Sequence, residues 1–123
     1  MVTRLADVQV LAGRWCLAAL FVAGTVQKLL DPVPAMALLA AWSWPVWLVW
    51  PAALFNALGA ASLLSGLWLR PMATALALYC MVTSLFHFLP ADSWQMSIFV
   101  KNWAIAGGLL ILSGVDKASD RTV

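Results

Sequence analysis

The stretch QMSIFVKNWAIAGGLLILSG, residues 95–114, decides the fold of this chain. It is one apolar run in which Lys101 and Asn102 stand side by side near the start, and Gly107 and Gly108 follow past the middle. A helix of about twenty such residues spans the roughly 30 Å hydrocarbon core of a bilayer. A water-soluble helix would carry a polar stripe on its outer face, and this stretch has none. Residues 95–114 therefore predict a transmembrane helix.

The lysine and the glycine pair indicate how this helix packs. Because a charge in lipid is costly, Lys101 is expected to face protein or water. Adjacent glycines remove side-chain bulk where a neighbouring helix can approach closely. We therefore expect residues 95–114 to pack with other apolar helices and to carry a polar group into their midst.

The composition agrees with an integral membrane protein. Of the 123 residues, 64% are hydrophobic and 10% are charged. A net charge of +2, scattered along the chain, gives no indication of a nucleic-acid partner. One histidine and two separated cysteines cannot build a closed metal site, and no Cys-x-x-Cys pair indicates thiol–disulfide chemistry. We expect both Cys16 and Cys80 to be buried and reduced.

Three further apolar stretches complete the predicted architecture, an all-α four-helix transmembrane bundle in a single domain. The four expected helices cover residues 8–30, 47–69, 72–89 and 95–114. Between the first two, residues 35–42 are predicted to form a short helix along the membrane interface, followed by a turn at Pro45. The reason is the local run of tryptophans, which favour the headgroup level. A plain loop, or an aromatic entrance for a quinone or a lipid, are the alternatives.

Small residues at helical spacing predict where the helices touch. Gly24 shares one face of the first helix with Arg14 and Lys28, and the second helix carries glycines with 3-4 spacing. Such residues let two helix backbones approach in lipid. The expected helix-packing residues are Gly24, Gly59, Gly66, Gly107 and Gly108. The second and third helices are expected to be joined by a very short turn at residues 70–71.

Four membrane-spanning helices place both termini on the same side of the membrane. Most basic residues gather towards that side, against Lys28 and Lys101 towards the other; they are Arg4, Arg14, Arg70, Lys117 and Arg121. The positive-inside rule then predicts that both termini are cytoplasmic.

Polar residues near the outer ends of the helices form the candidate site. They are Lys28, His87, Lys101 and Asn102. If their helix faces turn inward, they make a cationic, donor-rich pocket that suits a quinone carbonyl, an oxyanion such as a sulfur oxyacid, or a lipid phosphate. The alternative is structural: Lys28 pairs with Asp31, Lys101 reaches to the interface, and His87 bonds a backbone carbonyl.

Several segments resemble the DoxX family of membrane proteins. In order, they are LAGRWCLAALFVAGTVQKL (11–29), NALGAASLLSGLWLRPMATALAL (56–78), LFHF (85–88) and KNWAIAGGLLIL (101–112). The resemblance implies a bacterial or archaeal four-helix protein of the cytoplasmic membrane. It also implies a link to redox systems, because family members include a subunit of a thiosulfate:quinone oxidoreductase and partners of oxidative-stress enzymes. Where many members have a glutamate in the second helix, this chain has Asn56.

Two classes of function remain open at this stage. In the first, the chain is a small integral subunit or scaffold of a redox membrane complex, with no cofactor of its own and a quinone at a shared site. Its partners are then membrane lipid and other subunits, or further copies of the same chain. In the second, it is a stand-alone membrane oxidoreductase or a small-molecule or lipid-binding protein. The sequence shows no nucleophile with its base and acid, which favours the first class.

Overall fold

The computed structural model describes the backbone of residues 2–122 and the side chains of residues 5–114. Its elements in chain order are α1 (Val2–Leu30), α2 (Val33–Ala41), the short 3₁₀ turn η1 (Val46–Leu48), α3 (Val49–Ser65), α4 (Leu69–Ser84), the 3₁₀ turn η2 (Leu85–His87) and α5 (Ser93–Thr122). The basic side chains expected at the chain ends, Arg4, Lys117 and Arg121, lie outside the described side chains.

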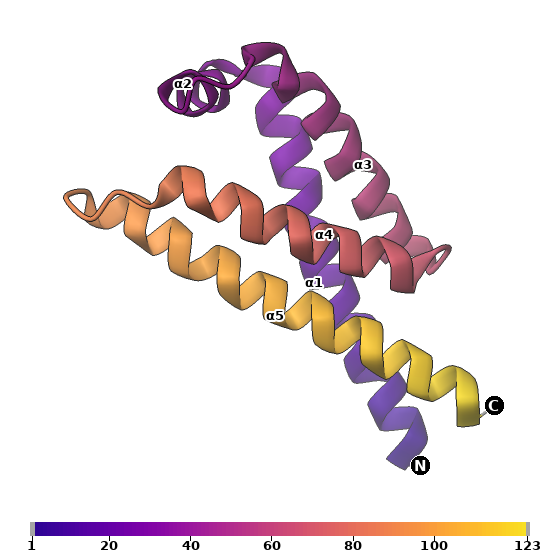
Figure 1. Cartoon of the computed structure of the whole chain (residues 1–123). Helices are drawn as coiled ribbons and strands as arrows, with labels where there is room; N and C mark the ends of the chain where they lie inside the picture. The colour runs from indigo at the N-terminus through magenta and orange to yellow at the C-terminus, as the bar shows by residue number, and fades with distance from the viewer. Residues whose placement is uncertain (1, 123) are drawn as a thin grey trace.

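Four segments are long and apolar enough to cross a membrane. They are Leu5–Leu30, Val46–Ser65, Leu69–His87 and Ser93–Gly114. The prediction of an all-α fold, with four membrane-spanning helices and a short helix between the first and the second, is confirmed. Figure 1 shows α2 nearly end-on beside the ends of α1 and α3, so that its axis runs crosswise to theirs.

Two aspartates hold the starts of helices at the connections opposite the chain termini. Asp31 follows the last residue of α1, and its Oδ1 accepts a hydrogen bond from the Val33 N–H at 3.3 Å. Asp92 precedes α5, and its Oδ1 accepts from the N–H groups of Trp94 at 3.0 Å and Gln95 at 3.3 Å. The first N–H groups of a helix have no intrahelical partner, and an aspartate at this position satisfies them.

The turn between α3 and α4 lies a few residues earlier than predicted. We expected it at residues 70–71, but α3 ends at Ser65 and α4 begins at Leu69. Gly66 takes a φ of +85°, a conformation that suits glycine because it has no Cβ. Pro71 lies in the first turn of α4, where a missing N–H costs no hydrogen bond. Gly66 is therefore a turn residue.

The helices form two antiparallel pairs. In Figure 1, α1 lies beside α3 and α4 lies beside α5, and the second pair crosses the first at a steep angle. Contacts within each pair are much more extensive than contacts between the pairs. The beginning of α1 and the end of α5 lie at the same end of the molecule, and α2 lies at the opposite end. The bundle thus consists of two antiparallel helix pairs that cross each other.

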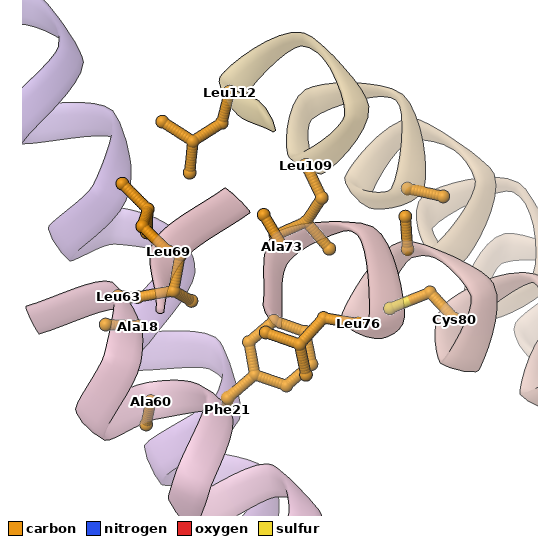
Figure 2. Packing of buried hydrophobic residues seen from close by; sticks show 12 residues of the cluster. Ala18, Phe21, Ala60, Leu63, Leu69, Ala73, Leu76, Cys80, Leu109 and Leu112 are labelled. Carbon is orange, nitrogen blue, oxygen red and sulfur yellow. The ribbon is translucent and has the colours of Figure 1, made fainter. Parts of the chain in front are cut away.

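The apolar core joins the two pairs in the half of the molecule near the termini. Figure 2 shows its side chains converging on α4 from the other three long helices. The buried cluster consists of Ala18, Phe21, Ala60, Leu63, Leu69, Ala73, Leu76, Ala77, Cys80, Ala106, Leu109 and Leu112. Cys80 is buried in this cluster as expected, whereas Cys16 is exposed, so the prediction that Cys16 is buried is wrong. Both are free thiols.

Arg14 ties α1 to the end of α3. Its Nε donates to the Leu63 carbonyl at 3.0 Å, and its Nη2 donates to the Leu64 carbonyl at 3.4 Å. These carbonyls belong to the last turn of α3, which carries the negative end of the helix dipole and has no further N–H groups to bond. A Cβ on Gly66 would stand 3.1 Å from Arg14 Nη2, so the glycine also leaves room for the guanidinium.

The helix-packing glycines differ in what they touch. A Cβ on Gly59 of α3 would come within 2.6 Å of Leu76 Cδ2 on α4, so this glycine permits a close contact between the two pairs. At Gly107 and Gly108, an added Cβ would meet no described atom within 4 Å. The expected close approach thus occurs at Gly59, while the described part of the chain makes no such contact at the glycine pair of α5.

Gly59→Leu and Gly108→Leu form a matched pair of variants that tests this contact. Leu76 is fully buried, and a Cβ at position 59 would overlap its side chain, so overpacking in Gly59→Leu should lower the free energy of unfolding by about 1–3 kcal/mol. Gly108→Leu has the same change in helix propensity and should alter stability little. Unfolding in a mild detergent titrated with a denaturing one measures both. Equal losses in the two variants would contradict the assignment.

Arg14→Leu tests the link between α1 and α3. Removing both donors leaves two carbonyls at the end of α3 without their partner, which should cost about 1–3 kcal/mol of unfolding free energy. The neighbouring Trp15 is 55% exposed, so Trp15→Leu is the control, and it should leave stability nearly unchanged. An Arg14→Leu protein as stable as this control would show that the guanidinium contributes nothing.

Candidate functional site

A cavity of about 530 Å³ lies between the two helix pairs, in the half of the molecule away from the core. Its walls come from residues 20–28 of α1, 48–56 of η1 and α3, 79–87 of α4 and η2, and 98–102 of α5. Ala35, Leu38 and Leu39 of α2 cover one end. The volume falls in the range of small-molecule sites, and most of the lining side chains are apolar, as in such sites.

Six polar side chains line this otherwise apolar cavity. They are Lys28, Asn56, Tyr79, Thr83, His87 and Asn102. Of the residues predicted from the sequence, Lys28, His87 and Asn102 are therefore brought together, from three different elements. Gly24 lines the same space.

Lys28 and Asn56 both have their side-chain nitrogens close to Gly24. A Cβ at Gly24 would stand 3.3 Å from Asn56 Nδ2 and 3.8 Å from Lys28 Nζ, so the missing side chain leaves room for both nitrogens. Asn56 is only 2% exposed, and its Oδ1 has no hydrogen-bond partner. Tyr79 lies within hydrogen-bonding reach of the Asn56 side chain. This part of the cavity therefore holds a cation, an amide donor and an acceptor without a partner.

Lys28 is half-buried and does not pair with Asp31, contrary to the structural alternative. The Asp31 carboxylate accepts a hydrogen bond from the Val33 N–H instead. Among the described residues, the partly buried ammonium of Lys28 has no acidic neighbour. An ammonium in this position attracts the oxygen of an anion or of a carbonyl.

His87 is held from α5. Its Nδ1 lies 2.6 Å from Gln95 Oε1, so its partner is a side chain and the expected backbone carbonyl is not used. The residue before it, Phe86, is buried, and its ring centre lies 5.7 Å from that of Trp42 and 5.1 Å from that of Trp44, both in T-shaped arrangements. These aromatic contacts attach the α2 end of the first helix pair to η2 of the second.

Lys101 does not line the cavity. Its side chain is exposed, and its Nζ lies 5.7 Å from the centre of the Trp94 ring. Consecutive residues on a helix point about 100° apart, so Asn102 can face the cavity while Lys101 faces outward. The structure thus separates this lysine from the other three predicted residues.

Sequence reasoning missed Tyr79, Thr83 and Gln95. The first two had a detectable signal, because Tyr79, Thr83 and His87 follow one another at intervals of four and so share one helix face. Gln95 had none, since its contact with His87 depends on how the loop between α4 and α5 closes. Asn56 was singled out only as a departure from a family pattern.

The cavity is partly open, and some of its lining side chains are exposed. Leu20 of α1 and Val82 of α4 line it and are 43% and 47% exposed. Both residues lie well inside membrane-spanning segments, so this part of the cavity wall is at membrane depth.

In a comparison with known protein families, residues 9–89 match the family model DoxX. The match runs from α1 to the loop after η2 and includes Lys28, Asn56 and His87, but it ends before α5. Comparisons with curated proteins and with solved structures gave no match. Since the matched residues make up well over half of the chain, it belongs to the DoxX family.

Proposed function

We propose that this multi-pass membrane protein is a small integral subunit of a redox membrane complex, and that its cavity holds the head group of a quinone. One observation carries the proposal: Lys28, Asn56, His87 and Asn102 meet in an apolar cavity of about 530 Å³. The cavity is large enough for a substituted ring, and its few polar groups can orient one.

The chemistry of the walls suits a quinone head. A carbonyl oxygen accepts charge-assisted hydrogen bonds, and Lys28 Nζ and Asn56 Nδ2 are donors on the same side of the cavity. The ring of the ligand would pack against Phe21, Phe55 and other apolar walls. We expect its tail to reach lipid past Leu20 and Val82, which line the cavity and are exposed at membrane depth.

The subunit role has two supports. Large apolar side chains are exposed on all four membrane-spanning helices, which leaves surfaces for lipid and for neighbouring helices. The redox link itself comes from the resemblance to DoxX proteins. The alternatives are a stand-alone oxidoreductase and a protein that binds an oxyanion or a lipid phosphate at Lys28. Lys28 favours the binding of an anion, because its ammonium has no acidic neighbour among the described residues.

Lys28→Gln and Lys101→Gln test the cavity with a matched pair of charge removals. Quenching of tryptophan fluorescence by a short-tailed benzoquinone measures its affinity for the protein in lipid nanodiscs. Lys28→Gln should weaken binding about 10- to 100-fold, the contribution of a hydrogen bond from a charged donor. Lys101→Gln should bind normally.

Three kinds of ligand, a quinone, an oxyanion and a phospholipid, separate the alternatives when each is tested for binding. Equal losses in both variants would place the ligand outside the cavity. Sulfate or thiosulfate binding without quinone binding would favour an oxyanion site, and binding of a short-chain phospholipid alone would favour a lipid site. Either result would remove the quinone from the proposal.

The subunit role is tested by gentle purification of the native protein from its membrane. Mass spectrometry should find stoichiometric partner chains, and the visible spectrum of the preparation should show the chromophores of a redox complex. A lone protein that turns over a substrate without partners would defeat the subunit role and favour the stand-alone enzyme.

We further propose that the termini face the cytoplasm of a bacterial or archaeal cell. The structure offers two exposed positions at opposite ends, Leu67 in the turn after α3 and Ser93 at the start of α5. In a protein whose own cysteines are replaced by alanine, Ser93→Cys should react with a membrane-impermeant thiol reagent in intact cells. Leu67→Cys should react only after lysis. The reverse pattern would invert the topology.

A further inference from the structure

The two nitrogens of the His87 ring face different surroundings. Nδ1 is 2.6 Å from Gln95 Oε1, and Gln95 does not line the cavity. The other nitrogen, Nε2, has no hydrogen-bond partner among the residues whose side chains the structure describes. Among the described side chains, the one buried polar atom without a partner is Asn56 Oδ1. Because His87 lines the cavity and its Nδ1 is turned to Gln95, Nε2 is the ring nitrogen left for a ligand there.

The bond to Gln95 determines which nitrogen carries the proton. An amide oxygen has lone pairs and no hydrogen, so it can only accept. The hydrogen in this bond must then belong to Nδ1. A neutral imidazole has one N–H, so Nε2 is left with a lone pair and accepts hydrogen bonds.

We propose that Gln95 is a positioning residue that holds His87 in its Nδ1–H tautomer, so that Nε2 accepts a hydrogen bond from a hydroxyl group of the ligand in the cavity. The tautomer is inferred from the contact between His87 and Gln95. The hydroxyl-bearing head group rests on the proposed function, and it specifies which form of the ligand the cavity prefers.

The cavity then has hydrogen-bond donors at one place and a further acceptor at another. Lys28 Nζ and Asn56 Nδ2 offer hydrogens near Gly24, where Asn56 Oδ1 is an acceptor without a partner, and His87 Nε2 offers a lone pair. A fully oxidised quinone has only acceptor oxygens, so one of them would face this lone pair without a hydrogen between them. A hydroquinone can donate one hydroxyl to His87, while the oxygen of the other accepts from the lysine. The arrangement favours the reduced form.

The chain contains a single histidine, which makes the tautomer directly measurable. A protein labelled with ¹⁵N-histidine and carrying no histidine tag gives the nitrogen signals of one imidazole ring. At about pH 8.5, where an ordinary imidazole is neutral, Nδ1 should show the shift of a protonated nitrogen and Nε2 that of an unprotonated one. A proton on Nε2 would overturn the proposal, because the Gln95 amide would then donate to Nδ1.

Variants of Gln95 show whether this residue sets the tautomer. Gln95→Leu removes the acceptor and should shift the signals to the mixture of tautomers found for free imidazole. Gln95→Glu keeps an oxygen acceptor and should keep the Nδ1–H form. Gln27→Leu, at an exposed glutamine of α1, is the control and should match the unaltered protein. Unchanged tautomers in Gln95→Leu would assign the effect to another group.

Binding of the two redox forms tests the hydroxyl. Under anaerobic conditions, the unaltered protein should bind a short-tailed benzohydroquinone about 3- to 10-fold more tightly than the matching quinone, the contribution of one hydrogen bond. His87→Phe and Gln95→Leu should both abolish this preference. Equal affinities in the unaltered protein would overturn the hydroxyl contact.

A third ligand separates this inference from the proposed function. Short-chain phosphatidylglycerol also carries hydroxyl groups beside an acceptor oxygen. If it binds in a His87-dependent way and neither benzoquinone form does, the hydroxyl contact is supported and the quinone of the proposed function fails. If none of the three depends on His87, the contact itself is refuted, whatever the tautomer.

Discussion

The two helix pairs are packed together along only half of their length, and the cavity follows from this. Gly59 lets α3 approach Leu76 of α4 closely, and the core beside this contact draws on all four membrane-spanning helices. Because the pairs cross at a steep angle (Figure 1), close contact in one half requires separation in the other. Apolar packing ends near Phe21 and Cys80, and the cavity begins at the same residues.

The bilayer requires that polar groups find partners within the protein. Thr25 and Thr83 each donate to the carbonyl four residues earlier in their own helix, and Arg14 bonds the last turn of α3. Asn56 Oδ1 is the described exception, since it is buried and has no partner. An unsatisfied buried group costs about 1–3 kcal/mol, so its position on the cavity wall, beside Lys28, is consistent with a ligand site.

The sequence predicts those features that depend on one helix at a time. Hydropathy and length locate the membrane-spanning helices, and the run of tryptophans locates α2. Lys28, His87 and Asn102 line one cavity because each lies near the same end of its helix. Lys101 was assigned to the site, and Gly107 and Gly108 to helix packing, from residue type alone. Which side of α5 touches α4 depends on both helices, and the sequence of α5 by itself does not determine it. The turn at Gly66 was missed because Pro71, the stronger local signal, fits inside the first turn of a helix.

The contribution of α5 cannot be derived from the matched residues 9–89. These residues supply Lys28, Asn56 and His87, yet the ring of His87 is oriented by Gln95 of α5. The link is made possible by the short loop after η2, in which Asp92 starts α5 and so fixes Gln95 within its first turn. The same helix supplies Ile98 and Asn102 to the cavity wall. The last helix therefore both closes the cavity and determines which nitrogen of its histidine is available to a ligand.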